Sequence, residues 1–430
     1  MNPIPIASRR DEGPDKRTSR AGSAAKPRRR TRPKEKGIRG ANDYTMAKGW
    51  RRYRRREVLP IIVISGYYGA GNTGDEAILA AMLEALRAAI PGGEFVVLSR
   101  DPAHTRTLHG VAALHRGLGR DLRAKLSLLR RADLFISGGG GLFQDAFPRR
   151  HIPRSVLYYA GICALARLCG CPVMFYAQGI GPLRGRLARR LARAAAGLAC
   201  AVTVRDPGSA ALLLDLGARG APIRVAADPV LAWHPPREGG VLERFGLGGR
   251  RILAVSVRPW PGQACLRAVA GAADRAAAHG LRPVFVPFAR GVDEEACRAA
   301  RASMADGDAA VILPHLPPAD VYRVLAGAEL VLGMRLHALI FAAAAGVPMV
   351  GLAYEPKVRA LMDLLGLAPW SLALDADAGG IWEALSSAGE RRGEIGAALN
   401  ASMPDLRRKA LSAAAWAAEI AARGRPRREG

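Results

Sequence analysis

The sequence of 430 residues is half hydrophobic and 23% charged, a composition that excludes a largely disordered chain and predicts a globular protein with more than one domain. Its formal net charge is +27, from 64 lysines and arginines against 37 aspartates and glutamates. The six cysteines include no C-x-x-C pair and show no metal-ligand geometry, which favours reduced, buried thiols in a cytoplasmic protein.

The first 57 residues differ in composition from the rest. They contain 19 lysines and arginines against 6 aspartates and glutamates, and they show no hydrophobic periodicity, so we expect a disordered basic tail over 1–57. The segment KPRRRTRPKEK could contact acidic lipid headgroups or nucleic acid, whereas a solvated tail, or a true start at Met46, would require neither. We expect no nucleic-acid partner for the folded part.

From Val58 onwards, short apolar runs alternate with amphipathic helical patterns. This alternation is typical of a parallel sheet that helices cover on both faces. The expected strands are VLPIIVIS, EFVVLS, DLFISGG, CPVMFYAQ, AVTVR and IRVAADP, with helices between most of them, for example over 75–89, 153–168 and 183–196. Residues 58–235 are therefore predicted to form an N-terminal Rossmann-like α/β domain.

A stretch rich in proline, glycine and charge follows, and 236–250 is predicted to be a linker. The alternation then restarts with the expected strands ILAVSVR, RPVFVPF, AAVILP, AELVLG and VPMVGLAY. We expect a C-terminal Rossmann-like α/β domain over 251–403, and a final helix from about Pro404 with a basic tail over 404–430. The predicted fold is α/β, with two Rossmann-like lobes facing a cleft, as in GT-B enzymes.

Glycines and charged residues gather directly after these strands, at the edge where open α/β sheets bind ligands. GYYGAGNTGDEAIL, SGGGGLFQD and AQGIGPL follow strands of the first lobe. Later strands are followed by Arg205, by Asp228, by Arg258, by GMRLHAL and by AYEPKVR. Backbone N–H groups combined with a few cations suit a phosphate or a carboxylate.

The turn after the first strand has glycines at 69, 71 and 74 and fits G-x-G-x-x-G, and Asp101 follows the second strand, as in dinucleotide-binding proteins. However, Asp75 and Glu76 stand directly behind the third glycine, where they would repel a pyrophosphate. The residues alone leave two interpretations of Asp75 open. It is either an N-cap or first-turn carboxylate, or a general acid or base that faces the cleft.

Several motifs occur in a characteristic order: GYYGAGNTGDEAIL, SGGGGLFQD, YAQGIGPL, VRDPGSAALLLDLG, ADPV and GMRLHALIFAAAAGVPMVGLAYEPKV. Together they resemble the polysaccharide pyruvyl transferase family, in its CsaB-like branch, over about residues 58–367. The resemblance implies transfer of the enolpyruvyl unit of phosphoenolpyruvate onto a sugar, which yields a pyruvate ketal and phosphate. In the CsaB-like branch the acceptor is N-acetylmannosamine of a secondary cell wall polysaccharide, and the ketal serves in S-layer anchoring.

This chemistry assigns roles to the residues after the strands. Phosphoenolpyruvate carries a carboxylate and a phosphate, for which arginine forks and helix N-termini are suitable partners. The expected substrate-binding residues are Arg205, Arg258, Arg335, Leu336 and Lys357. The expected catalytic residues are Asp75, as the base for the acceptor hydroxyl, and His337, as an acid or phosphate partner.

No cofactor or metal is expected, because side chains can supply the positive charge, and His104, His109 and His115 lack ligand spacing and suit a surface segment. The expected partners are phosphoenolpyruvate and a lipid-linked cell wall glycan. The expected location is the cytoplasm, with peripheral contact at the inner face of the plasma membrane as a further option. The alternative function is that of a GT-B glycosyltransferase that uses a nucleotide sugar, since a fold does not determine a function.

Overall fold

The structure is a computed structural model that describes residues 59–117, 119–145, 154–236 and 239–423. By its contacts the chain separates into the units Met1–Arg56 and Glu57–Gly430. The predicted basic tail over 1–57 lies outside the described residues, as do residues 424–430. The fold and the site below belong to the second unit.

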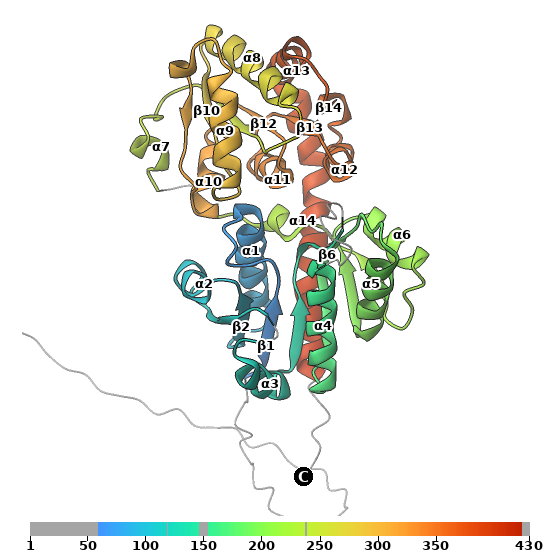
Figure 1. Cartoon of the computed structure of the whole chain (residues 1–430). Coiled ribbons are helices and arrows are strands. Elements are labelled where there is room, and N and C mark those ends of the chain that lie inside the picture. The colour runs from blue at the N-terminus through green and yellow to red at the C-terminus, as the bar shows by residue number, and fades with distance from the viewer. Residues whose placement is uncertain (1–58, 118, 146–153, 237–238, 424–430) are drawn as a thin grey trace, which may run out of the picture. The chain divides into compact units, whose positions relative to one another are not determined.

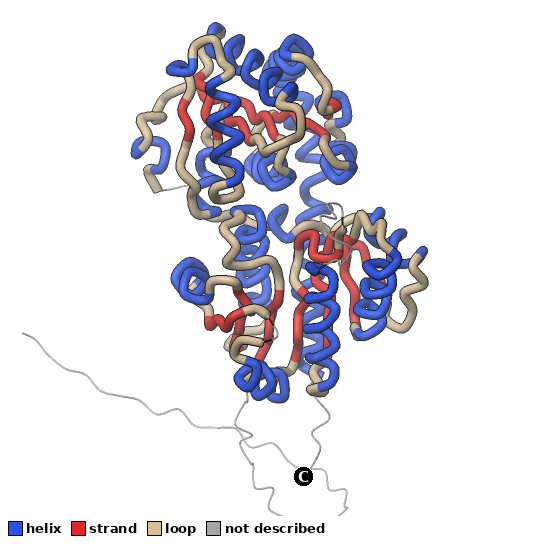
Figure 2. Tube along the Cα trace, in the orientation of Figure 1, coloured by secondary structure: helices blue, strands red, loops and turns tan. Residues whose placement is uncertain are grey.

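The first sheet has eight parallel strands in the order β3-β2-β1-β4-β6-β7-β8, with β5 paired to β6 (Figures 1 and 2). The strands are β1 (Ile61–Ser65), β2 (Glu94–Ser99), β3 (Ala112–His115), β4 (Leu134–Ser137), β5 (Gly140–Phe143), β6 (Val173–Ile180), β7 (Ala201–Val204) and β8 (Ile223–Val225). The helices are α1 (Thr73–Ala89), α2 (Pro102–His109), α3 (Leu122–Arg131), α4 (Arg154–Leu168), α5 (Arg186–Leu198) and α6 (Pro207–Asp215). The central strands β4 and β6 are buried along their whole length because helices cover both faces.

The second sheet has six parallel strands in the order β11-β10-β9-β12-β13-β14. The strands are β9 (Ile252–Ser256), β10 (Arg282–Phe285), β11 (Val311–Ile312), β12 (Leu330–Gly333), β13 (Met349–Ala353) and β14 (Ser371–Ala373). The helices are α7 (Val241–Arg244), α8 (Ala264–Ala278), α9 (Val292–Ala302), α10 (Pro318–Ala326), α11 (Leu336–Ala345), α12 (Pro356–Leu364), α13 (Ala378–Glu390) and α14 (Arg392–Arg423), and the 3-10 turns are η1 (Pro229–Ala232), η2 (Gly307–Ala309) and η3 (Ala368–Trp370). The predicted α/β class is confirmed.

A single hydrophobic cluster joins the second sheet to the inner face of the first. At its centre Trp233, which directly follows η1, lies 6.1 Å from Tyr322 on α10 and 6.0 Å from Phe341 on α11, measured between ring centroids. The outer face of the first sheet has a separate cluster under α4 and α5. The packing between the two sheets therefore brings loops from both halves of the sequence together.

The last helix, α14, begins at Arg392 and continues through Pro404, so it starts earlier than predicted. Proline is favoured in the first turn of a helix, which is why the sequence places the start there. The helix contacts α1 and η1 of the first half as well as α11 and α13 of the second. It thus supports both halves.

Three short strands, β3, β5 and β14, were not expected from the sequence, because runs of three or four residues with glycine or alanine carry little periodicity. The expectation of a histidine-bearing surface segment was wrong in part. His115 ends β3, and the ring of His109 is buried against Glu76. In the described ranges, no helix combines the length and apolar character needed to cross a membrane. The domain boundaries around 236–250 stay a prediction.

Candidate active site

Asp75 lies in the first turn of α1 and does not cap the helix. The N-cap is Asn72, whose Oδ1 accepts hydrogen bonds from the backbone N–H groups of Gly74 at 3.0 Å and Asp75 at 3.3 Å. Of the structural interpretation of Asp75, the N-cap half is therefore wrong and the first-turn half is confirmed. Its side chain is only partly exposed, and burial raises the pKa of its carboxyl group to about 6, against the opposing effect of His337.

The neighbouring carboxylate, Glu76, is fully engaged inside the protein. Its Oε1 accepts a hydrogen bond from the Gly69 N–H at 2.7 Å, and its Oε2 lies 2.9 Å from Nε2 of His109. Glu76 therefore fastens the glycine-rich turn and α2 to the start of α1. Of the two acidic residues behind the third glycine, only Asp75 is left for chemistry.

His337, on α11, lies across the start of α1. A Cβ atom built on Gly74 would come within 2.2 Å of its Nδ1, so only glycine fits beneath the imidazole ring. The ring and Asp75 interact electrostatically. Gly74, the third glycine of the G-x-G-x-x-G turn after β1, thus makes room for a histidine from the second half of the chain.

Asp228, the cap residue of η1, connects two predicted site residues. Its Oδ2 lies 3.6 Å from Nε2 of His337 and 3.2 Å from Nη1 of Arg205, while its Oδ1 accepts the Val230 N–H at 3.2 Å. Burial alone would raise the pKa of this carboxyl group, but His337 and Arg205 hold it below its usual range. The sequence analysis noted that Asp228 follows a strand but did not select it as a site residue.

Arg205, at the end of β7, has a second and longer contact with Oδ2 of Asp206 at 3.7 Å. Asp206 mainly caps α6, because its Oδ1 accepts the Ser209 N–H at 2.7 Å. A Cβ atom on Gly179 would lie 2.8 Å from the Arg205 Nε, so another glycine makes room for a predicted site residue. Arg205 is thus held mainly by Asp228, inside the site.

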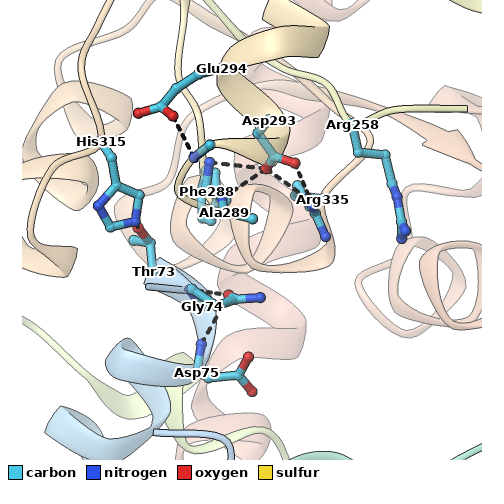
Figure 3. Close-up of polar contacts among 12 residues, drawn as sticks. Thr73, Gly74, Asp75, Arg258, Phe288, Ala289, Asp293, Glu294, His315 and Arg335 are labelled. Atoms are coloured by element: carbon cyan, nitrogen blue, oxygen red, sulfur yellow. Dashed lines mark hydrogen bonds and ion pairs between the residues drawn. The ribbon is translucent and has the colours of Figure 1, made fainter. Parts of the chain in front are cut away.

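Arg335 directly precedes α11 and is paired with a buried carboxylate. Its Nε donates to Oδ2 of Asp293 at 2.9 Å, and its Nη2 donates to Oδ1 (Figure 3). Asp293 also accepts the backbone N–H groups of Phe288 at 3.1 Å and Ala289 at 2.9 Å. One edge of the guanidinium group is therefore used within the protein, and the edge that carries Nη1 is left for a ligand.

The loop at Phe288 and Ala289, which Asp293 holds, also contacts the start of α1. The Thr73 N–H donates to the Phe288 carbonyl at 2.8 Å, and the Thr73 hydroxyl lies 3.2 Å from Nε2 of His315 (Figure 3). Burial, together with nearby Arg290, lowers the pKa of His315. Hydrogen bonds therefore connect Arg335 to the start of α1, two residues before Asp75.

Arg258 and Lys357 share one acidic neighbour. Nη1 of Arg258 lies 3.7 Å from Oε1 of Glu355, and the Lys357 ammonium group pairs with Oε2 of the same residue. The Arg258 guanidinium group also stacks over the Tyr354 ring, 4.6 Å from its centroid. Arg258, which follows β9, and Lys357, on α12, are therefore both held in place by Glu355.

The site is thus nearly balanced in charge. The four predicted cations, Arg205, Arg258, Arg335 and Lys357, face the carboxylates of Asp75, Asp228, Asp293 and Glu355. Sequence reasoning found the cations but not their partners Asp228, Asp293 and Glu355. Leu336, the first residue of α11, has a buried side chain, so only its backbone can meet a ligand. Among the described residues, no group of three or more His, Cys, Asp or Glu side chains could hold a metal ion.

The comparison with known families matches residues 72–356 to the family described as polysaccharide pyruvyl transferase. This chain belongs to the polysaccharide pyruvyl transferase family. The match includes Asp75, Arg205, Asp228, Arg335 and the rest of the site, up to the residue before Lys357. The pyruvyl transferase is therefore a transferase by family, as predicted. No curated protein matches its sequence.

Solved structures show the fold of this pyruvyl transferase. S. aureus MnaA with UDP aligns at a TM-score of 0.59 and 12% identity, over 82% of this chain and 94% of that chain. Anabaena HepE (Alr3699) with UDP and glucose aligns at 0.57 and 13%, over 84% and 99%. The UDP-GlcNAc 2-epimerase of Neisseria meningitidis bound to UDP-GlcNAc aligns at 0.55 and 10%, over 82% and 97%. The predicted GT-B-like fold is confirmed.

Proposed function

We propose that this enzyme transfers the enolpyruvyl unit of phosphoenolpyruvate to N-acetylmannosamine of a secondary cell wall polysaccharide, and that it belongs to the CsaB-like branch. The products are a pyruvate ketal, which carries the carboxylate for S-layer anchoring, and phosphate. The family membership supports the reaction type, and the order of motifs from 58 to 367 supports the branch. A lipid-linked acceptor puts the reaction in the cytoplasm, at the inner face of the plasma membrane.

The observation that carries this proposal is the convergence of Asp75, His337 and Asp228. They come from the start of α1, the start of α11 and the turn after β8, and they lie next to one another. A base and an acid that face each other, beside several cations, are what addition of a hydroxyl group to an enol phosphate needs.

Phosphoenolpyruvate would bind among the cations of the second sheet. Arg335 would use the guanidinium edge that Asp293 leaves open, and Arg258 and Lys357 would turn from Glu355 towards the phosphate. The N-terminus of α11 has no side-chain cap, so the N–H groups of Leu336 and His337 can also face an anion. The carboxylate partners orient these cations before the substrate arrives.

The chemistry then needs one proton donor and one proton acceptor. His337 would give a proton to C3 of phosphoenolpyruvate, which becomes a methyl group, while Asp75 takes the proton of an acceptor hydroxyl whose oxygen attacks C2. The C2–O bond to phosphate breaks, phosphate leaves, and a second hydroxyl of the same sugar attacks C2 and releases its proton. Overall, two hydroxyl protons are lost, one is retained in the methyl group, and the other leaves with phosphate or solvent.

Asp228 would support His337 and Arg205 at once. Its buried carboxylate lies 3.6 Å from Nε2 of His337 and 3.2 Å from Nη1 of Arg205, so it orients both side chains in the site. The raised pKa of Asp75 fits a carboxylate that is ionised at neutral pH yet able to take a proton.

The test is to incubate the purified chain with phosphoenolpyruvate and a synthetic disaccharide that ends in N-acetylmannosamine, and to measure phosphate release and the mass of the sugar. A sugar that gains one pyruvate ketal for each phosphate released is expected. The alternative, a GT-B glycosyltransferase, predicts instead that a nucleotide sugar is consumed and phosphoenolpyruvate is left unchanged. That second result would overturn the proposal.

A further inference from the structure

A solvent-open hollow of about 690 Å³ lies at the carboxyl ends of β2 and β3. Its lining residues include Gly69, Arg100, Asp101, Arg106, His115 and Asp121. The strand β2 pairs directly with β1, so the hollow lies along the same sheet edge as the turn that leads to Asp75. Its volume is within the range of about 300–1,000 Å³ that is usual for small-molecule sites. None of the residues assigned above to phosphoenolpyruvate binding lines this hollow.

Backbone hydrogen bonds connect the hollow to the turn that leads from β1 to Asp75. The Gly69 N–H, on its wall, donates to the carboxylate of Glu76, which directly follows Asp75. The Arg100 N–H donates to the Tyr68 carbonyl at 2.9 Å. A ligand in the hollow would therefore be held at a constant distance from the proposed base.

The polar side chains of the hollow are held in place by hydrogen bonds to the backbone, and each has further donor or acceptor atoms left for a ligand. Oδ1 of Asp101 accepts the His104 N–H at 3.0 Å, Oδ2 of Asp121 accepts the His115 N–H at 3.3 Å, and Nη1 of Arg106 donates to the Ala113 carbonyl at 3.1 Å. Each carboxylate has a second oxygen atom, and the Arg106 guanidinium group has further N–H donors, with which a ligand could form hydrogen bonds. The exposed Arg100 guanidinium group has no hydrogen-bond or ion-pair partner in the part of the chain that the structure describes.

The charges of the hollow favour a neutral ligand that is rich in hydroxyl groups. Arg100 and Arg106 are balanced by Asp101 and Asp121, so a phosphate would meet as much repulsion as attraction. Carboxylates and guanidinium groups, with two parallel positions each, match neighbouring hydroxyl groups of a pyranose ring.

We propose that this hollow binds the sugar unit next to the one that receives the pyruvyl group. The acceptor class is then an oligosaccharide of at least two units, and a monosaccharide is a poor substrate. This inference rests on the proposed function and extends it from the reacting sugar to the following one.

The test uses two substitutions in the full chain and one matched control. Ala103→Trp fills the hollow from an exposed position of α2, and Arg100→Ala removes the unpaired guanidinium group. Ala415→Trp places the same indole at an exposed position of α14, outside the hollow, and has the same loss of helix propensity. Binding of the N-acetylmannosamine-terminated disaccharide and of methyl N-acetylmannosaminide is measured by titration calorimetry without phosphoenolpyruvate, and the KM of each acceptor is measured with it.

Wild type should bind the disaccharide about tenfold more tightly than the monosaccharide, since the second unit adds hydrogen bonds in the hollow. Ala103→Trp and Arg100→Ala should remove most of that difference, and leave the monosaccharide and phosphoenolpyruvate unaffected, while Ala415→Trp matches wild type. Equal affinity of wild type for both sugars, no disaccharide binding at all, or full disaccharide affinity in both hollow variants would overturn the inference. Pyruvyl transfer to both sugars with equal KM would refute sugar binding in the hollow but keep the proposed function. Disaccharide binding that depends on the hollow, without any pyruvyl transfer, would refute the proposed function but keep sugar binding in the hollow.

Discussion

Replacing Asp75 by asparagine should make the enzyme more stable and much slower. The carboxyl pKa is raised from 3.8 to about 6 in the folded protein, so the ionised form is less favourable there than in the unfolded chain. This difference costs about 3 kcal/mol of folding free energy at neutral pH. The cost is absent below the unfolded pKa, grows as pH rises, and is complete above the folded pKa near 6.

Asparagine removes this cost and keeps the shape of the side chain. The helix cap is unaffected, because Asn72 provides it, and only the favourable charge in the first turn, about 0.3–1 kcal/mol, is lost. The net gain should be about 2 kcal/mol at pH 8 and close to zero at pH 3. Turnover should fall about a hundredfold or more, as is usual when a general base is removed.

The assay is thermal unfolding at pH 8 and in acid, together with steady-state rates for phosphoenolpyruvate and acceptor. The matched control is Glu76→Gln at the adjacent position, which breaks a buried pair with His109 and should lower the melting temperature instead. A near-wild-type rate for Asp75→Asn would show that Asp75 is not the base. A lower melting temperature at pH 8 would show that the electrostatic reasoning is wrong.

Three further results are expected. Gly74→Ala should gain helix propensity but displace His337, so kcat should fall at least tenfold. The control Gly396→Ala, in an open position of α14, should leave kcat at the wild-type value. Equal rates for the two variants would contradict the packing of His337 against Gly74. Arg335→Lys loses the planar pair with buried Asp293, so it should raise the KM for phosphoenolpyruvate and cost about 1–3 kcal/mol of stability, both visible in kinetics and denaturant titration. Deleting residues 1–45 should leave the melting temperature and turnover unchanged, because the family match begins at residue 72, and a clear drop in either would refute this.

The sequence alone was sufficient for the fold class and for a candidate site at one edge of the sheets. Near-continuous apolar strands separated by amphipathic helices have few arrangements other than covered parallel sheets, and ligands then meet the residues after the strands. This reasoning selected Asp75, Arg205, Arg258, Arg335, His337 and Lys357 as candidate site residues, which stay a prediction, and the motif order pointed to the family that the comparison shows. Local patterns were enough to select them because each of these residues follows a strand, Arg335 and His337 the same one.

The partners of those residues depended on the tertiary structure. Asp293 lies on α9, far in sequence from Arg335, and its buried carboxylate resembles any first-turn acid until the two elements pack together. Likewise, Gly74 looks like part of a phosphate-binding turn, and only the packing of α11 against α1 shows that it accommodates the ring of His337. A sequence pattern records which face of an element is apolar, but contacts between distant elements depend on how the two sheets pack, and that packing decided which charges are paired and which of the two acids, Asp75 or Glu76, is left for chemistry.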